Sequence, residues 1–430
     1  MQSVCTTGYA QSQAVTFAAS CGQGTDSGHR QQERPIVLIT SHILMGHLSP
    51  MLRIASKLVT RGWEVAFLGP TAHRARIEAT GAVFIALRGD ADIYDKRYYE
   101  IPPTPDYATL HWSQRVCEDI RYQLVEPLPT AWECFTDALG ALQSSNMGSG
   151  ETSRREVVLL SEAFSWGVLP LFYGAKLPDG VNTPLGSLGV PGLDYPRSDW
   201  PPHLRFVGLA QMKMPTDKDE LDDDVGFSWW EEILANSKLP ALSPLRKKLL
   251  VVSQGTVEIN PLDLIIPTLR AYANQADDVL AVAILGWKDA NLEGYRQHFT
   301  RGELPSNARI ADFLNYDTVL RHADVWIHNA GFGAVCHGIA NGVPMVCAGE
   351  GMDKVDNARR VAWAGTGVDL QTQTPTADMV RRGVDRILSS DEGPLFRDKI
   401  MALRQESEKL QCFDAVENEL LRLASRQHAS

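Results

Sequence analysis

The amino-acid chain has 430 residues, a length typical of two or three domains of about 150 residues each. Its 44% hydrophobic and 22% charged residues are ordinary for globular proteins, and no run reaches the ~18 apolar residues that a membrane-spanning helix needs. The 52 acidic and 41 basic side chains give a net charge of −11, which would repel a nucleic acid. The seven cysteines contain no Cys-x-x-Cys pair, which favours a reduced, cytoplasmic setting.

Residues 1–34 are expected to form a disordered N-terminal tail, because they are rich in Ser, Thr, Gln and Gly. Their apolar run at 14–19 is interrupted by Thr16 and follows no basic stretch. A signal peptide is therefore not expected.

Residues 35–216 are expected to form a first α/β domain. The β-branched run 36–39 predicts a buried strand, and apolar positions at helical spacing predict a helix after it. Ser49 suits the cap of this helix and Pro50 its first turn, while residues 64–69 predict the next strand. Strand, helix and strand in succession indicate a βαβ unit with a parallel sheet.

A second α/β domain is expected over residues 246–393, after an acidic linker at 217–245. Six of the eight residues from 217 to 224 are acidic, which is typical of a solvated segment. The strands predicted beyond the linker are 249–252, 279–284, 309–311, 323–328 and 344–348, with helices from Pro261 and over 334–341. Residues 394–430 are expected to be C-terminal helices. The sequence thus predicts two Rossmann-like domains facing a cleft, with functional loops at the carboxyl ends of the strands.

The segment Asn329-Ala330-Gly331-Phe332-Gly333-Ala334 joins a predicted strand to a predicted helix. Its small residues let backbone N–H groups approach a diphosphate at the positive end of the helix, although such glycines also serve close packing without a ligand. The segment half-matches a dinucleotide fingerprint, because Glu350 and Asp353 follow Gly331 by 19 and 22 residues while Cys336 replaces the third glycine. An NAD(P)-dependent oxidoreductase is therefore one alternative.

His47 lies in the predicted loop between the first strand and the helix from Pro50, at the carboxyl edge of the sheet. Histidine is the side chain most easily poised as a general base near neutral pH. Glu162 follows the predicted strand 157–160 and could orient this imidazole, as in a His–acid dyad. His42 competes for the role of base, and a structural or merely exposed role is the alternative for each of these side chains.

Two N-terminal stretches resemble a known family. Gly46-His47-Leu48-Ser49-Pro50, continued by Leu58 to Val65, is similar to the Gly-His-x-x-Pro loop, helix and Arg-Gly-His-Glu-Val turn of family 1 UDP-glycosyltransferases. The resemblance runs from about residue 36 to the C-terminus and implies the two-domain GT-B fold. It further implies that His47 is the catalytic base. In Ser161-Glu162-Ala163-Phe164, Glu162 stands where the family has the Asp that orients this histidine.

The second half resembles the donor-binding region of the same family. Ser253-Gln254-Gly255-Thr256 looks like a phosphate-contacting turn, and Phe313-Leu314-Asn315-Tyr316 resembles the start of the plant donor signature, which implies stacking of Phe313 on uracil. Asn329 stands for the diphosphate-binding His of plant enzymes, His337 for the ribose-binding Glu, and Asp353-Lys354 for the Asp-Gln pair that holds sugar hydroxyls. Bacterial and fungal relatives, of the natural-product or sterol-glycosyltransferase type, carry Asp-Lys there. The donor-binding residues implied are Thr256, Phe313, Leu314, His328, Asn329, Gly331, Phe332, Gly333, Ala334, His337, Asp353 and Lys354.

The resemblance implies inverting transfer of a sugar, glucose from UDP-glucose in the first instance, to a hydroxyl group of an acceptor. The UDP-sugar is a co-substrate, so no cofactor is expected, and no cluster with metal-ligand spacing is found in the sequence. An acceptor of hydrophobic small-molecule type is expected from the aromatic residues Tyr94, Tyr98, Tyr99, Tyr107, Trp112, Phe164, Trp166 and Phe172. A C-terminal helix crosses back to the first domain in relatives. A non-catalytic sugar-nucleotide-binding protein and an epimerase of the same fold are further alternatives.

Overall fold

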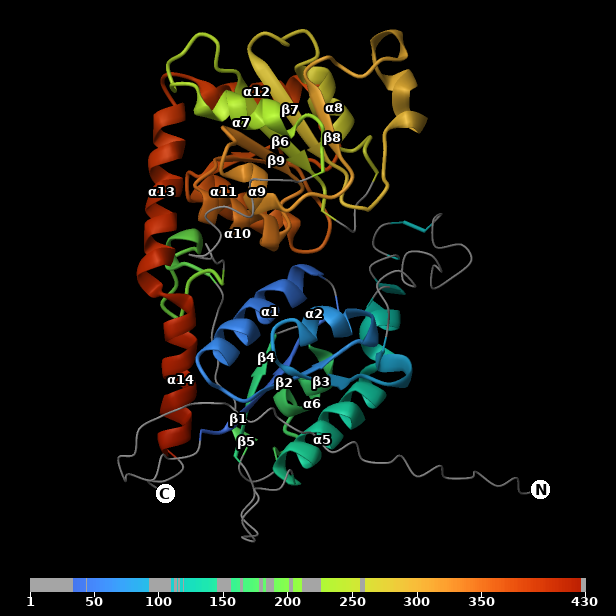
Figure 1. Ribbon diagram of the computed structural model, residues 1–430, viewed down its shortest axis with the longest axis vertical. Helices are drawn as coiled ribbons and strands as arrows, with labels where there is room; N and C mark the ends of the chain where they lie inside the picture. The colour runs from blue at the N-terminus through green and yellow to red at the C-terminus, as the bar shows by residue number, and fades with distance from the viewer. Residues whose placement is uncertain are drawn as a thin grey trace, which may run out of the picture. The chain divides into compact units, whose positions relative to one another are not determined.

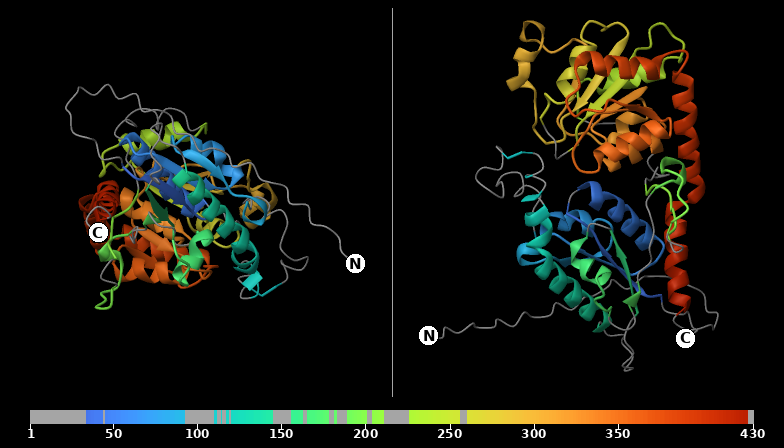
Figure 2. Two further views of the ribbon diagram at one scale, coloured as in Figure 1. Left: turned by 90° about the horizontal axis from the view of Figure 1, so that it is seen from below. Right: turned by 180° about the vertical axis from the view of Figure 1, so that it is seen from behind.

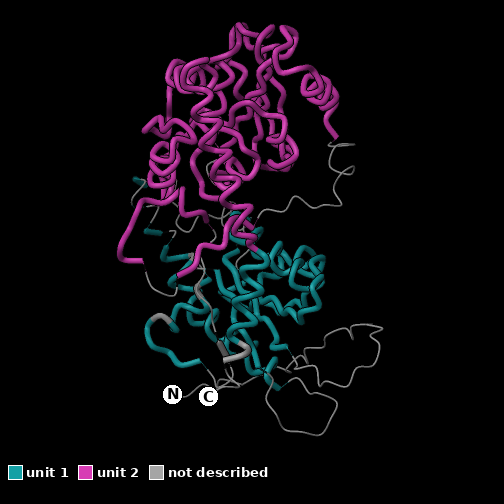
Figure 3. Tube along the Cα trace, turned by 90° about the vertical axis from the view of Figure 1, so that its left-hand side faces the viewer, with its two compact units in different colours: residues 1–185, 413–430 teal, residues 186–412 magenta. Residues whose placement is uncertain are grey.

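The structure is a computed structural model that describes residues 34–43, 45–92, 110–111, 114, 117–118, 120–144, 156–162, 165–177, 181–182, 189–200, 204–210, 226–255 and 260–426. Residues 1–33 of the expected tail and the acidic run at 217–224 lie outside the described residues. The chain divides into two compact units, which are residues 1–185 with 413–430 (unit 1) and residues 186–412 (unit 2) (Figure 3). No helix in the described part of the chain is long and apolar enough to cross a membrane.

Unit 1 contains, within its described residues, a parallel five-stranded sheet in the order β3-β2-β1-β4-β5. The strands are β1 (Ile36–Thr40), β2 (Val65–Gly69), β3 (Val83–Ala86), β4 (Val157–Ser161) and β5 (Val181–Asn182). The chain runs outward from β1 to β3 and then returns to the other side of β1, so the winding direction changes between β1 and β4. In α/β sheets the loops beyond such a topological switch point form ligand sites.

The central strands β1 and β2 are buried along their whole length and have no alternation of apolar and polar residues, whereas β3 is half-buried. The sheet and its helices are labelled in Figure 1. On one face, Ile36 and Leu38 pack with Phe135 and Leu139 of α5 (Leu128–Ser144). Contacts with β1 and β2 are also made by α1 (Met45–Thr60). The remaining α-helices described in the first part of the chain are α2 (Arg74–Glu78) and α6 (Leu169–Phe172).

Helix α1 begins at Met45, five residues before the start predicted at Pro50. Pro50 is the sixth residue of this helix and has no N–H, so the carbonyl of Gly46 lacks its usual intrahelical donor. His47 consequently lies in the first turn of a helix and not in a loop. Its position beyond the carboxyl end of β1 is the one that the sequence predicts.

The C-terminal helix α14 (Cys412–Arg426) belongs, from Phe413 onward, to unit 1. The preceding helix α13 (Gly393–Leu410) belongs to unit 2, and Gln411 between them has φ 49°, in the left-handed region. Arg61 after α1 donates to Glu417 at 2.5 Å and also pairs with Asp414. These contacts join the two sequence-distant parts of unit 1.

Unit 2 contains a parallel sheet with six described strands in the order β11-β10-β9-β6-β7-β8. The strands are β6 (Lys248–Ser253), β7 (Val279–Ile284), β8 (Ala308–Ala311), β9 (Val325–His328), β10 (Met345–Cys347) and β11 (Gly367–Asp369). The chain runs outward from β6 to β8 and then builds β9 to β11 on the other side of β6. The switch point of this sheet therefore lies between β6 and β9.

Helices cover both faces of the second sheet, and all of them can be followed in Figures 1 and 2. The helices are α7 (Trp230–Lys238), α8 (Ile265–Ala271), α9 (Tyr316–Leu320), α10 (Phe332–Asn341), α11 (Lys354–Trp363), α12 (Ala377–Leu388) and α13. Leu250 and Val252 of β6 pack into one core with α8 and α12, whereas Leu249 and Val251 pack into another with α7 and α9. The alternation of strand side chains thus divides them between two buried faces.

The two units differ in extent from the domains expected from the sequence. Residues 186–210, expected in the first domain, belong to unit 2, because Val190, Leu193 and Leu209 are buried against α10, α11 and α13. The expected linker at 217–245 includes α7, whose Trp230 and Ile233 are buried against the second sheet. Unit 2 thus includes residues on the N-terminal side of β6 that the sequence assigns to the first domain and to the linker.

Candidate active site

The side chains of His47 and Glu162 meet at the switch point of the first sheet. Thr40 and Ser161 are neighbours at the ends of β1 and β4, and the backbone N–H of Glu162 donates to the carbonyl oxygen of Thr40 at 3.0 Å. From this position Oε1 of Glu162 lies 3.0 Å from Nδ1 of His47. The side chain of Glu162 is one methylene longer than that of the Asp found in the family, and here it reaches the imidazole. The predicted dyad is therefore assembled in unit 1.

The geometry of this pair fixes which nitrogen of His47 can accept a proton. A carboxylate is an acceptor only, so Nδ1 facing Glu162 carries the hydrogen and Nε2 keeps its lone pair. The His47 side chain is 36% exposed and that of Glu162 is 15% exposed. A partly exposed imidazole backed by a mostly buried carboxylate can take a proton from a ligand, because the carboxylate stabilises the resulting positive charge.

His42, the competing candidate for the base, is buried at 8% exposure. Its ring centroid lies 5.4 Å from that of His47, in an edge-on arrangement. Burial, followed by the neighbouring His47, lowers the pKa of His42 to about 4. A buried ring of such low basicity is a poor proton acceptor at neutral pH, and this favours His47 over His42.

In unit 2 the loops after β6 and β9 are joined at the switch point. Gln254 follows β6 and Asn329 follows β9, and the side-chain amide of Asn329 donates to the carbonyl oxygen of Gln254 at 2.6 Å. Gln254 in turn accepts from the N–H of Ile265 at 3.2 Å and donates to Asn260 at 2.8 Å. Thr256, predicted to contact phosphate, lies outside the described residues. Asn329 therefore connects the two loops that follow β6 and β9 at this edge of the sheet.

The turn between β9 and α10 contains a backbone conformation that is unusual for its residue. Ala330 has φ 61°, where an L-residue costs about 1–2 kcal/mol more than glycine. Its N–H donates to Nδ1 of His328 at 3.0 Å, and its carbonyl oxygen accepts from the side-chain amide of Asn357 at 3.0 Å. Ala330 is fully buried. Two side chains thus hold both polar groups of a strained residue.

His328 is fully buried, so its ring is not exposed to a diphosphate. Burial lowers its pKa to about 3, which keeps the imidazole neutral and leaves Nδ1 as an acceptor. Nε2 faces Sγ of Cys347 at 3.8 Å. The contacts of His328 support the backbone of the turn, and its buried ring does not suit the direct donor contact that the resemblance implies for this residue.

The first turn of α10 presents backbone N–H groups beside open space. Gly331 caps the helix, and the N–H groups of the next three residues precede the first intrahelical bond, from Val335 to the Gly331 carbonyl. A Cβ atom added at Gly333 would meet no atom within 4 Å in the described part of the chain. Phe332 is 38% exposed. This helix end can therefore admit an anion close to its backbone.

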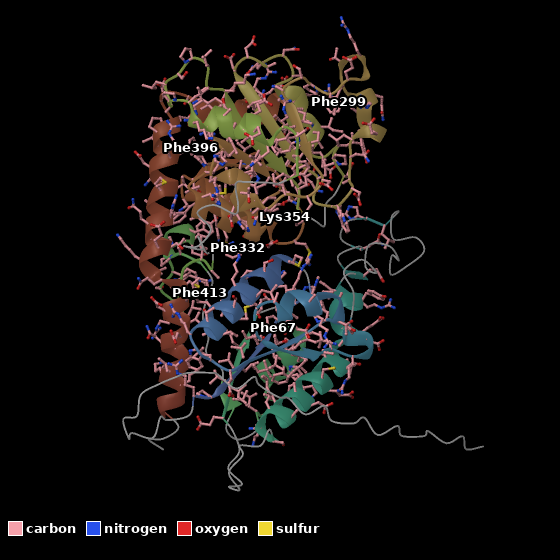
Figure 4. All side chains as sticks on the ribbon, viewed as in Figure 1. Phe67, Phe299, Phe332, Lys354, Phe396 and Phe413 are labelled. Carbon is pink, nitrogen blue, oxygen red and sulfur yellow. The ribbon has the colours of Figure 1, made fainter. Side chains whose placement is uncertain are left out.

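Phe332 and Lys354 begin α10 and α11 at the same edge of unit 2, because β9 and β10 are parallel neighbours (Figure 4). Asp353 is exposed directly before α11, and its Oδ2 accepts from Asn357 at 2.8 Å. Lys354 is buried at 8% exposure. Asp353 is thus placed where it can bind a polar ligand, beside the first turn of α10.

His337, on the second turn of α10, pairs with Asp317 of α9, with 2.6 Å between Nδ1 and Oδ1. The same carboxylate oxygen accepts from Asn341 at 2.7 Å. Both side chains of the pair are about one-fifth exposed, at 18% and 22%. The position expected to contact ribose is therefore occupied by a polar pair and not by a single carboxylate.

Phe313 is 59% exposed at the carboxyl end of β8, while Leu314 is buried. The carboxylate of Asp312 accepts from the N–H groups of Asp289 and Phe313, which holds its pKa below the usual value and fixes the start of the loop. Asn315 caps α9 by accepting from Asp317 at 3.0 Å. An exposed aromatic ring on a fixed loop is suited to stacking on a planar ligand.

Two residues at these sites, Asp317 and Asn357, are not among those singled out in the sequence, and Gln254 is predicted only as part of the phosphate-contacting turn. Asn357 follows Asp353 by four residues, so the two share one face of a helix start, and this spacing is the signal available in the sequence. Asp317 is found only through its contact with α10, which no local pattern reveals. The aromatic residues expected to bind the acceptor lie outside the residues, or the side chains, that the structure describes.

Comparisons with known proteins agree on one family. The family described as "Erythromycin biosynthesis protein CIII-like, C-terminal domain" matches residues 292–421. UDP-glucosyltransferase 1 of Beauveria bassiana is 30% identical, with 88% of this chain and 93% of that protein covered. UDP-glucosyltransferase B1 of Starmerella bombicola is 29% identical, with 91% and 99% covered. The solved glycotransferase of kitacinnamycin has a TM-score of 0.59 at 19% identity, with 90% and 99% covered.

Proposed function

This chain belongs to the UDP-glycosyltransferase family with the GT-B fold, and from that premise we propose that it transfers glucose from UDP-glucose to a hydroxyl group of a hydrophobic small molecule, with inversion at the anomeric carbon. That it is a glycosyltransferase follows from the family. The choice of glucose is supported by the names of both fungal relatives.

In the proposed reaction His47 acts as the general base. Nε2 takes the proton of the acceptor hydroxyl while the acceptor oxygen forms a bond to the anomeric carbon, and the bond from that carbon to the diphosphate oxygen breaks. Because the attack comes from the face opposite the leaving group, the configuration inverts. Glu162 stabilises the imidazolium that results. The 3.0 Å contact between His47 and Glu162 is the observation that carries this proposal.

In unit 2 the N–H groups at the start of α10 hold the departing UDP, whose negative charge grows as the bond breaks. The open position at Gly333 gives the diphosphate access to these groups. Phe313 stacks on uracil, and Asp353 accepts hydrogen bonds from sugar hydroxyls. His337, paired with Asp317, faces the ribose of the donor, which joins the uracil to the diphosphate. Binding of a nucleotide by this unit needs no metal ion in this proposal, since a helix end supplies the positive potential.

The test is incubation of purified protein with UDP-glucose and a panel of lipophilic hydroxylated compounds, with release of UDP as the readout. Mass spectrometry should find one added hexosyl group, and NMR should find the β-anomer from the α-linked donor. Thermal shifts with UDP and with NADPH, measured separately, should show stabilisation by UDP alone. UDP binding without transfer to any compound would favour a non-catalytic relative, and retention of the α-configuration would overturn the role of His47.

A further inference from the structure

Asn357 is a buried residue on α11 that bonds two parts of the donor site at once. It is 4% exposed, and its single side-chain amide donates to the carbonyl oxygen of Ala330 at 3.0 Å and to Oδ2 of Asp353 at 2.8 Å. Ala330 leads into the first turn of α10, and Asp353 is the carboxylate proposed to bind the sugar. One side chain therefore links the diphosphate and sugar parts of the site.

The backbone held by this amide is strained. Ala330 has φ 61°, a conformation that glycine adopts freely and alanine avoids. Strained residues persist where their surroundings over-determine them, and such residues gather at functional sites. Here the N–H of Ala330 is held by His328 and the carbonyl oxygen by Asn357. If one of the two bonds is lost, the peptide groups on either side of Ala330 can relax to an ordinary conformation.

The direction in which the α10 N–H groups point depends on this turn. Gly331 caps the helix directly after Ala330, so rotation of the intervening peptide displaces the start of α10. The backbone of Gly349, after β10, packs closely against the same turn, because a Cβ atom added there would lie 2.2 Å from the carbonyl oxygen of Asn329. A turn held in this way keeps its N–H groups in place before the ligand arrives, which is how preorganised sites gain binding energy.

We infer that Asn357 is a positioning residue that holds Ala330 in its left-handed conformation for diphosphate binding and orients Asp353 for the sugar. The inference rests on the proposed function, since it assigns the two contacts of Asn357 to two parts of the donor. Asn357 itself touches neither part. Its role is separable into a backbone component at Ala330 and a side-chain component at Asp353.

The test is a double-mutant cycle with Ala330→Gly and Asn357→Ala, read out by the Kd of UDP and the KM of UDP-glucose. Asn357→Ala should weaken UDP binding about tenfold, the effect of one buried hydrogen bond. Ala330→Gly alone should change it by less than about threefold. In the double variant UDP binding should return to about the level of Ala330→Gly alone, because glycine adopts the required φ without the bond.

The KM of UDP-glucose should not recover in the double variant, because Asp353 still lacks its donor. If Asn357 has only a general structural role, Asn357→Ala should weaken UDP binding equally whether position 330 is alanine or glycine. That outcome overturns the inference, as does an unchanged Kd in Asn357→Ala. If Asn357→Ala is too unstable for titration, Ala330→Gly should restore its Tm, and failure to do so also overturns it. Wild-type protein that binds no UDP would instead contradict the proposed function.

Discussion

Nδ1 of His47 and Oε1 of Glu162 are 3.0 Å apart although 115 positions separate the two residues in the chain. The contact follows from the topology, since β1 and β4 are parallel neighbours on the two sides of the switch point. Each residue follows the end of its strand, so both arrive at the same edge of the sheet. Nothing local to either segment forces this pairing.

The first prediction concerns Glu162 and His47. His47→Ala should lower kcat by about 10²–10⁴, the usual contribution of a general base, and leave the Kd of UDP unchanged. Glu162→Gln should lower kcat in the same direction, because a neutral amide cannot stabilise the imidazolium. Adding Glu162→Gln to His47→Ala should lower kcat little further, because the carboxylate acts through the imidazole.

Steady-state kinetics with UDP-glucose and isothermal titration with UDP measure the two quantities separately. A suitable control is Glu78→Gln, which removes an exposed carboxylate that pairs with Arg74 on α2 and should leave kcat unchanged. If His47→Ala keeps a kcat close to that of the wild type, His47 is not the general base. An equal fall in UDP affinity would indicate that the variant disturbs the fold and not the chemistry.

The sequence predicts eight of the described strands, because their apolar runs are short, continuous and rich in β-branched residues. It does not predict β3, β5 and β11, which lie at the edges of the two sheets and are only two to four residues long. It also places His47 and Glu162 beyond the ends of two strands. It does not predict which strands are neighbours, and this is why the contact itself needs the structure. The role of His328 as a donor-binding residue also could not be judged from the sequence, because local sequence does not reveal that its ring is fully buried.

The second prediction concerns Gly333 at the start of α10. A Cβ atom there meets no atom within 4 Å among the described residues, and alanine favours a helix more than glycine does, by about 1 kcal/mol. Gly333→Ala should therefore keep or raise Tm. It should nevertheless raise the Kd of UDP, because the methyl group occupies the space through which the diphosphate reaches the N–H groups.

Differential scanning fluorimetry and titration with UDP give the two readouts for Gly333→Ala. Gly294→Ala serves as the matched control, since an added Cβ there also meets no atom within 4 Å in the described structure. It lies in the loop between β7 and β8. Equal UDP affinity in both variants and in the wild type would argue against diphosphate binding at this helix end.

The third prediction concerns the pH dependence of stability. The pKa of His42 is about 4 in the folded chain, against 6.5 in the ordinary case, chiefly because the ring is buried. Below pH 6.5 the unfolded chain therefore binds a proton that the folded chain does not bind until the pH approaches 4. Stability should fall over this window, by about 1.4 kcal/mol for each pH unit at most, and level off below it.

Urea unfolding of the protein at a series of pH values between 7 and 4.5 gives the free energy of unfolding and hence this slope. His42→Gln should be less stable at pH 7, because it disturbs a packed site, but its stability should depend less steeply on pH. Buried His328, whose pKa is about 3, should leave a residual slope in unit 2. His111→Gln, at an exposed position, is the control. Identical slopes in His42→Gln and wild type would contradict the assignment.

The last prediction concerns the attachment of α14 to unit 1. Glu417 is 17% exposed, accepts from Nε1 of Trp63 at 2.8 Å and from Arg61 at 2.5 Å, and so satisfies two donors from one segment. Glu417→Ala removes both contacts and should destabilise unit 1 by about 1–3 kcal/mol. Glu417→Gln keeps an acceptor for Trp63 and should lower the free energy of unfolding by less.

Glu408→Ala is the matched control on α13, because Glu408 is 61% exposed and its pair with Arg404 should contribute less than about 1 kcal/mol. Urea midpoints of the three variants, compared at pH 7 and low salt, should rank Glu408→Ala as most stable and Glu417→Ala as least. Equal midpoints for the two alanine variants would mean that apolar packing alone, through residues such as the buried Leu420, holds α14 in place.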